Sequence, residues 1–323
     1  KRRSSGDGRG GIAPQNDLGA GDAGGWMKQL HFYYRMSSLF SDPITDHSFT
    51  LKCIPSSEST QDVMIFYKRI AAGKVSGDWT ASGKDAAGNQ YIYGRISAPY
   101  TAFSVEVEGT ARVSSGAGYK KEAAREMLYR FPTALTICTE EMERFLMNFW
   151  KRWPEMKEAA LMPSKLRAEQ QSLSFRKSMK NLMEAVFCHM EYVPSATTVT
   201  TTAGSAFAMK KGVCQDYAHI MIAFCRRMGI PAAYVAGYMM GEGASHAWVS
   251  VCDQSTGTWY EIDPTNDRWV DDDYIRVAVG CDAGDCVMNR GLYRGAAKEQ
   301  QEIVVIVEEK YDKKCGFNGS SCG

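Results

Sequence analysis

Residues 212–220 read GVCQDYAHI, and the interpretation of the whole chain depends on this stretch. After Cys214, apolar residues recur at positions 218, 221, 222 and 225, which is the spacing of one helix face. Gly229 followed by Ile230 and Pro231 ends that helix, because glycine tolerates the left-handed C-terminal conformation and proline cannot continue the hydrogen-bond ladder. We therefore predict that Cys214 lies in the first turn of a helix. Free N–H groups and the positive end of the helix dipole would stabilise a thiolate there.

A predicted β-hairpin downstream supplies partners for this sulfur. Residues 245–251 and 258–262 alternate small or polar with apolar residues, and residues 253–257 between them are turn formers. If Val251 pairs with Thr258, the strand register of the whole hairpin is fixed.

In this register His246 lies opposite Asp263, with both side chains on one face and close enough to hydrogen-bond. Glu261 lies on the same face and is the alternative carboxylate. With Cys214 this gives the nucleophile, base and orienting acid of covalent acyl transfer. Each residue alone also fits a structural role: a buried thiol, a buried histidine and a turn-capping aspartate.

Several ordered motifs between about residues 192 and 295 resemble the transglutaminase-like superfamily. More narrowly, they resemble bacterial transglutaminase-like proteins with an N-terminal β domain. Besides residues 212–220, the motifs are CRRMGIP (225–231), AGY (236–238), SHAW (245–248), DPTN (263–266), DYIRVAVG (273–280) and RGLYRG (290–295). The resemblance implies an α+β fold with a papain-like core, in which a helix-borne cysteine packs on an antiparallel sheet. It also implies a catalytic triad of Cys214, His246 and Asp263.

The chain departs from the family pattern at two points. Many relatives have arginine after Gly-Ile-Pro-Ala, where this chain has Ala233. Animal transglutaminases and peptide N-glycanases place an upstream tryptophan to hold the oxyanion, but no tryptophan lies between Trp153 and Trp248 here. Only the backbone N–H of Cys214 can therefore be assigned to the oxyanion.

The rest of the chain divides by composition and periodicity. Short alternating segments separated by turn residues, such as DAAGN at 85–89, predict an antiparallel sandwich. The strands of the sandwich are expected at 30–35, 49–54, 63–68, 91–96 and 103–107. Further along the chain we expect helices at 140–153 and 175–190 and a final strand at 303–307. The predicted segments are a disordered leader (1–25), a β-sandwich domain (26–115), a helical segment (116–190), the catalytic core (191–310) and a flexible tail (311–323).

Composition narrows the function classes. The 323 residues carry a net charge of +1 and are 44% hydrophobic, so bulk electrostatics favour neither nucleic-acid nor membrane binding. The longest β-branched apolar run is far shorter than a membrane span. The first residues are basic but are followed by Gly, Asp and Ser, so no signal peptide is visible, and the sequence leaves open whether a segment precedes Lys1. We expect a cytoplasmic protein.

Cysteine and acidic residues give no metal-site pattern. The ten cysteines include no Cys-x-x-Cys pair, which favours reduced thiols, and we expect no cofactor and no metal. Cys315 and Cys322 could instead form a disulfide in an oxidising compartment. The run 271–273 of three aspartates fits a solvated turn better than a calcium site, and His219 fits a structural role.

The expected activity is acyl transfer from a peptide or protein carboxamide through a thioester, with hydrolysis favoured, as by a protease or amidase. Three alternatives stay open: transfer to an amine, as by a transglutaminase, a non-catalytic binding module on the same scaffold, and a metal-dependent hydrolase. The oligomeric state cannot be read from the sequence.

Overall fold

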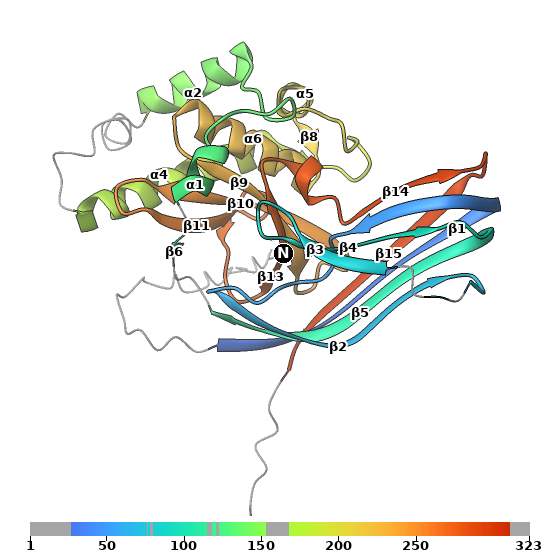
Figure 1. Ribbon diagram of the computed structural model, residues 1–323. Coiled ribbons are helices and arrows are strands. Elements are labelled where there is room, and N and C mark those ends of the chain that lie inside the picture. Colours follow the sequence, from blue (N-terminus) through green and yellow to red (C-terminus); the bar gives the residue numbers. More distant parts are fainter. Residues whose placement is uncertain are drawn as a thin grey trace, which may run out of the picture.

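The computed structural model describes residues 27–75, 77, 80–114, 118–120, 123–152 and 168–310. The fold is α+β, as predicted, with an antiparallel β domain followed by a second sheet that is covered by helices (Figure 1). The predicted leader, the predicted tail and the Cys315–Cys322 pair lie outside the described residues.

One long strand, β1 (Met27–Leu51), organises the β domain. Its first part pairs with β5 (Tyr100–Ser114), which also pairs with β2 (Gln61–Ala72). Its last part pairs with β4 (Gln90–Ile96), which also pairs with β3 (Thr80–Lys84). The strands predicted at 30–35 and 49–54 are therefore two parts of one strand, apart from the last three residues, which follow β1.

The bend in β1 makes the domain a sandwich. Its pairing with β5 is interrupted between Leu39 and Ile44, where Pro43 has no N–H to donate and Asp46 follows with a positive φ of 48°. Phe32 before the bend and Phe49 after it both lie in the same buried apolar cluster. The two halves of β1 thus supply one hydrophobic core from two sheets.

The last two strands complete the sandwich, which corrects the predicted segment bounds. β14 (Asn289–Arg294) pairs with the last part of β1, and β15 (Glu299–Glu309) pairs with residues 30–40 of β1. The strand predicted at 303–307 is present, but it belongs to the β domain although the predicted core range was 191–310. Periodicity identifies a strand but does not identify its partner.

The second sheet has the order β12-β11-β10-β9-β13, and β6 also pairs with β11. Ala247, Val249 and Ile262 on one face pack in a buried cluster with helix α6 (Cys214–Arg227). The strands are β6 (Tyr119–Lys120), β9 (Ala232–Met239), β10 (Ser245–Asp253), β11 (Thr258–Asp263), β12 (Arg268–Trp269) and β13 (Tyr274–Gly280). A short parallel pair, β7 (Glu191–Tyr192) and β8 (Lys211–Gly212), precedes α6.

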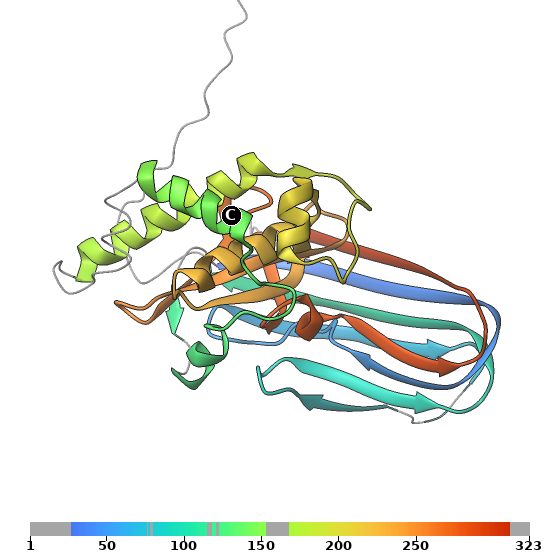
Figure 2. The same ribbon diagram turned by 90° about the horizontal axis from the view of Figure 1, so that it is seen from above.

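The helices cover this sheet on the side away from the sandwich, whose long strands project past them (Figures 1 and 2). They are α1 (Ala123–Leu128), α2 (Glu140–Arg152), α4 (Ala168–His189), α5 (Ala203–Met209) and α6 (Cys214–Arg227), with a 3-10 turn η2 (Ala283–Cys286). The helices predicted at 140–153 and 175–190 correspond to α2 and α4. Among the described helices, none is both long and apolar enough to cross a bilayer.

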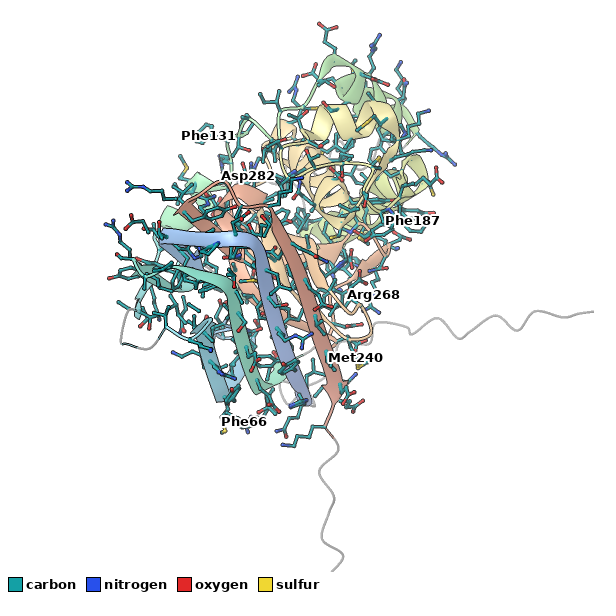
Figure 3. The ribbon with its side chains drawn as sticks, turned by 90° about the vertical axis from the view of Figure 1, so that its right-hand side faces the viewer. Phe66, Phe131, Phe187, Met240, Arg268 and Asp282 are labelled. Atoms are coloured by element: carbon teal, nitrogen blue, oxygen red, sulfur yellow. The ribbon has the colours of Figure 1, made fainter. Side chains whose placement is uncertain are left out.

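The sandwich and the second sheet share a buried contact. Tyr238 on β9 stacks on Tyr34 of β1 with ring centroids 5.6 Å apart, and its hydroxyl donates to the carbonyl of Cys53 at 2.6 Å. Exposed aromatic side chains lie elsewhere: Phe66 on β2 at the end of the sandwich away from the helices, and Phe187 on α4 (Figure 3).

Candidate active site

Cys214 is the first residue of α6, as predicted, and is half-buried with a free thiol. The side chain of Asp216 closes this helix start, because its Oδ2 accepts hydrogen bonds from the N–H of Val213 at 2.8 Å and from Thr197 Oγ1 at 2.6 Å. A side chain on Gly212 would come within 2.6 Å of the same carboxylate. Gly212 and Asp216 therefore fix the backbone on either side of the sulfur.

His246 and Asp263 form a buried hydrogen bond of 2.8 Å between Nε2 and Oδ2. The predicted register was wrong by two residues, since Val251 pairs with Tyr260 rather than with Thr258. A slip of two keeps both side chains on the same face, so His246 and Asp263 meet as diagonal neighbours instead of directly opposed ones.

The tighter turn explains the register. Asp253, predicted as a turn residue, ends β10 and pairs with Thr258. Its Oδ1 accepts hydrogen bonds from the N–H and the hydroxyl of Ser255, at 3.0 and 2.6 Å. Gly257 adopts the positive φ of 64° that this short loop requires.

Asp263 is held by more groups than the sequence indicates. Its Oδ2 also accepts hydrogen bonds from Tyr274 Oη and Asn266 Nδ2, both at 2.7 Å. Its Oδ1 accepts the backbone N–H groups of Thr265 and Asn266, at 2.9 and 3.3 Å. Burial by itself would raise the pKa of Asp263, but the hydrogen bonds and the charge of His246 outweigh it and lower that pKa. The roles of Tyr274 and Asn266 were missed, although both lie in the quoted motifs.

The surroundings of His246 favour its protonated form. Burial alone would lower the pKa of His246, but hydrogen bonding and charge from Asp263 and Cys214 outweigh burial and raise it to about 10. Nε2 donates to Asp263, and Nδ1 is buried and makes no hydrogen bond to the described residues. Besides Asp263, Cys214 is the other group that raises the pKa of His246, which indicates that the thiol lies near the ring.

Glu261, the alternative carboxylate, has different partners. Its Oε2 accepts a hydrogen bond from Trp248 Nε1 at 2.9 Å, and its Oε1 pairs with Arg276 and Tyr119. Trp248 packs over Gly237, where an added Cβ would come within 2.4 Å of the indole ring. The structure therefore places Asp263, and not Glu261, against His246.

Two tyrosine side chains, Tyr192 and Tyr234, lie near enough to Cys214 for its charge to affect them. Burial, followed by the charge of Cys214, raises the pKa of both Tyr192 and Tyr234. Tyr192 is half-exposed, whereas Tyr234 is buried on β9. Gln215 Nε2 donates to the carbonyl of Thr198 at 3.4 Å, which attaches the threonine-rich segment to the start of α6.

His219 lies in the core of the protein beside Tyr234, with the two ring centroids 5.3 Å apart. It is fully buried, and its Nε2 accepts a hydrogen bond from the N–H of Ala283 at 3.1 Å. Burial lowers the pKa of His219 to about 4, so the ring is neutral near pH 7. These features fit the structural role expected for it.

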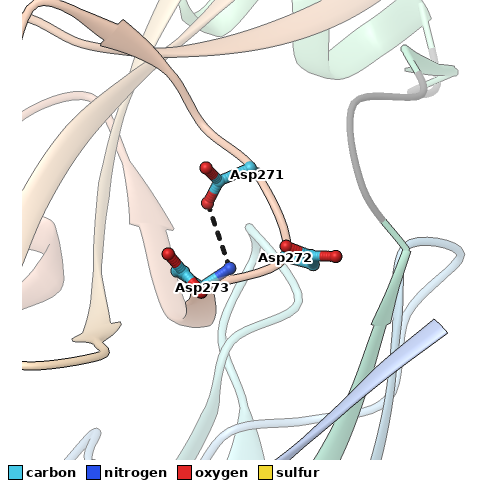
Figure 4. Close-up of side chains that lie close together, drawn as sticks. All are labelled: Asp271, Asp272 and Asp273. Atoms are coloured by element: carbon cyan, nitrogen blue, oxygen red, sulfur yellow. Dashed lines mark hydrogen bonds between the residues drawn. The ribbon is translucent and has the colours of Figure 1, made fainter. Parts of the chain in front are cut away.

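Asp271, Asp272 and Asp273 form a loop in which one carboxylate oxygen from each lies within 4.8 Å of the others (Figure 4). The N–H of Asp273 donates to Asp271 Oδ1 at 3.0 Å, as in a local turn. Lys28 Nζ lies 2.5 Å from Asp273, and Arg268 lies within 3.8 Å of Asp271. These cations balance the acidic charge, which fits the turn interpretation.

Parts of the chain are similar to known proteins. The family model of the transglutaminase-like superfamily matches residues 164–264. An uncharacterised protein of Mycobacterium leprae is 38% identical over 128 residues, covering 36% of this chain and 45% of that protein. An uncharacterised protein of Mycobacterium tuberculosis is 36% identical over 128 residues, covering 35% of this chain and 41% of that protein. The matched part of the chain thus spans less than half the length of these curated relatives.

A solved structure extends the likeness to both domains. The crystal structure of a candidate cysteine protease from Cytophaga hutchinsonii superposes with a TM-score of 0.66 at 17% identity, over 88% of this chain and 92% of that one. At this identity the likeness concerns the fold. The chain therefore carries a transglutaminase-like superfamily core, joined to an N-terminal antiparallel β domain.

Proposed function

We propose that the chain is a cysteine-dependent acyl-transfer enzyme that hydrolyses peptide or carboxamide bonds. One observation carries the proposal: the buried bond from Asp263 to His246 Nε2 leaves Nδ1 for the thiol of Cys214, which begins a buried helix. A nucleophile, a base and an orienting carboxylate in this order are the requirements of covalent acyl transfer.

In the proposed reaction Cys214 is a thiolate and His246 carries a proton on Nδ1, the state reached by transfer of the thiol proton to the imidazole. Sγ then attacks the substrate carbonyl carbon to form a C–S bond, and the backbone N–H of Cys214 donates to the oxyanion. As the C–N bond breaks, Nδ1 returns its proton to the leaving amine, and a thioester remains.

Water completes the proposed cycle. It attacks the thioester carbonyl while Nδ1 accepts one of its protons. The C–S bond breaks, the carboxylic acid leaves, and the thiolate of Cys214 and the protonated imidazole are restored. Asp263 keeps the imidazole in the tautomer that presents Nδ1 and stabilises the imidazolium. An amine in place of water would give a new amide, which is the transglutaminase outcome.

Incubation of the full chain with a fluorogenic peptide library tests the proposal. We expect cysteine-dependent cleavage that Cys214→Ala lowers at least about 10⁴-fold in kcat/KM, because the nucleophile is removed. Cys188→Ala is the matched control, since that thiol is free and exposed and lies on another helix, α4. Equal cleavage by wild type and Cys214→Ala would contradict the assignment.

The same assay separates the alternatives. Incorporation of a fluorescent primary amine into the peptide, instead of cleavage, would indicate a transglutaminase. Activity that is lost to a chelator but survives iodoacetamide would indicate a metal-dependent hydrolase. A binding module would show no turnover and would alkylate Cys214 no faster than Cys188.

A further inference from the structure

Strand β13 connects the sandwich with the candidate active site. It is the edge strand of the second sheet, and its outer edge is met by two side-chain amides of the sandwich. Gln61 Nε2 donates to the carbonyl of Arg276 at 2.8 Å, and Gln61 Oε1 accepts the N–H of Arg276 at 2.9 Å. Asn89 makes the same pair of bonds with Val279, both at 2.7 Å. Each amide thus replaces a peptide group of a neighbouring strand.

Side chains of β13 reach the His246–Asp263 pair by two routes. Tyr274 donates directly to Asp263 at 2.7 Å. Arg276 pairs with Glu261, which accepts the indole N–H of Trp248. The indole ring stacks beside the imidazole of His246, with centroids 6.3 Å apart and planes at 26°.

The sandwich also supplies a charge to this network. Glu58 Oε2 lies 2.5 Å from Arg276 Nη1, and the guanidinium lies 4.6 Å from the centre of the Tyr119 ring. Arg276 is buried, so its charge needs both Glu58 and Glu261 nearby. A carboxylate of the sandwich thereby helps to set the position of the guanidinium that holds Glu261.

We infer that the β domain is a working part of the active site, with Glu58 and Gln61 as positioning residues for His246; this inference rests on the proposed function. The bonds of Gln61 and Asn89 fix the register of β13, whose pairing with β9 is irregular between Arg276 and Ala278. A slip of one residue would move Tyr274 and Arg276 away from their partners. The hydrogen bonds at the edge of β13 therefore hold its side chains in position for the active site.

The test compares Glu58→Gln with Glu302→Gln in the full chain. Glu302 is a matched control because it pairs with Arg35 at 3.2 Å on the exposed face of the same domain. We expect Glu58→Gln to lower kcat roughly tenfold with KM within about twofold, since Glu58 acts through geometry and not through substrate contact. Glu302→Gln should match wild type. Gln61→Glu, which removes the donation of Nε2 to the carbonyl of Arg276, should repeat the effect, and Glu58→Asp should restore part of the loss.

A second readout does not depend on turnover. In protein labelled with ring-¹³C histidine, the His246 signal, assigned by its loss in His246→Asn, should shift in Glu58→Gln and stay in place in Glu302→Gln. If wild type shows no cysteine-dependent activity, the proposed function fails, while this signal still tests the positioning. Wild-type kcat together with an unmoved His246 signal in Glu58→Gln would overturn the inference.

Discussion

Two carboxylates on β11, Asp263 and Glu261, occupy similar positions but have different electrostatic partners. Each accepts a hydrogen bond from a ring N–H on β10, Asp263 from His246 and Glu261 from Trp248, at 2.8 and 2.9 Å. Glu261 is paired with the permanent cation Arg276, whereas among the described residues the only ion-pair partner of Asp263 is His246. Within the described part of the chain, Asp263 has no permanently charged partner, so its ion pair is with the imidazole of His246, which can gain or lose a proton. The comparison thus separates a proton-handling pair from a scaffolding pair two residues away.

The largest expected effect comes from removing the charge of Asp263. Asp263→Asn should lower kcat roughly 10³- to 10⁴-fold, because an amide donor facing Nε2 holds the wrong imidazole tautomer. Steady-state kinetics on the best library peptide measure this. Asp253→Asn, a buried aspartate of the same hairpin whose bonds serve the turn, should stay within about threefold. A variant Asp263→Asn with more than about a tenth of wild-type kcat would contradict the proton-handling role.

The next effect is a pH dependence of stability. The pKa of His246 is raised to about 10 in the folded chain, against about 6.5 when unfolded. Its contribution is therefore fully present below about pH 6.5 and is lost as the pH rises through about 10. The unfolding free energy of wild type relative to His246→Gln should thus fall by a few kcal/mol between about pH 6 and pH 10, at about 1.4 kcal/mol per pKa unit.

Urea unfolding at several pH values measures this difference. The lowered pKa of Asp263 affects stability in the acidic range. Its contribution to the unfolding free energy is present above the unfolded pKa of about 3.9 and is lost as the pH falls further. A wild-type advantage that does not change between neutral and alkaline pH would show that His246 is not held as an imidazolium.

Glu261→Gln should have a smaller effect on activity than Asp263→Asn. The amide oxygen can still accept from Trp248, but the buried guanidinium of Arg276 loses one of its two carboxylates. We expect a stability loss of about 2 kcal/mol and a fall in kcat of roughly tenfold. Thermal unfolding and kinetics on the same preparation measure both. A loss of kcat as large as that of Asp263→Asn would remove the distinction between the two carboxylates.

The smallest expected effect is that of Tyr274→Phe. It removes one of several hydrogen bonds to Asp263 and the contact of that hydroxyl with Arg268 Nε at 2.8 Å. The cost should be about 1 kcal/mol, with a severalfold fall in kcat. Kinetics and urea unfolding measure it, and Tyr293→Phe at a distant sandwich position is the control. An unchanged kcat would show that the remaining donors suffice to hold Asp263.

Local signals in the sequence were enough for the start of α6 and for the side of the hairpin that carries His246 and Asp263. Helical spacing after Cys214 and strand alternation repeat over several residues, so an error of two in the register still leaves the correct face. The turn at Asp253 was misplaced because side-chain bonds of a single aspartate tightened it.

Contacts between distant segments could not be predicted in this way. The bonds of Gln61 and Asn89 to β13 join residues 215 and 190 positions apart, and an amide in an alternating segment has no pattern that identifies its partner. The pairing of residues 289–309 with the sandwich was missed for the same reason, because their partner strand β1 lies at the other end of the described chain.

The shared strand β1 has a consequence for biosynthesis. It is among the first described segments to leave the ribosome, but two of its four partner strands, β14 and β15, are among the last. The sandwich therefore cannot close on the nascent chain until residue 309 has emerged, and until then both edges of β1 cannot be paired. Such pairing across nearly the full length is slow to form, so the newly made polypeptide depends on protection of that strand from intermolecular association.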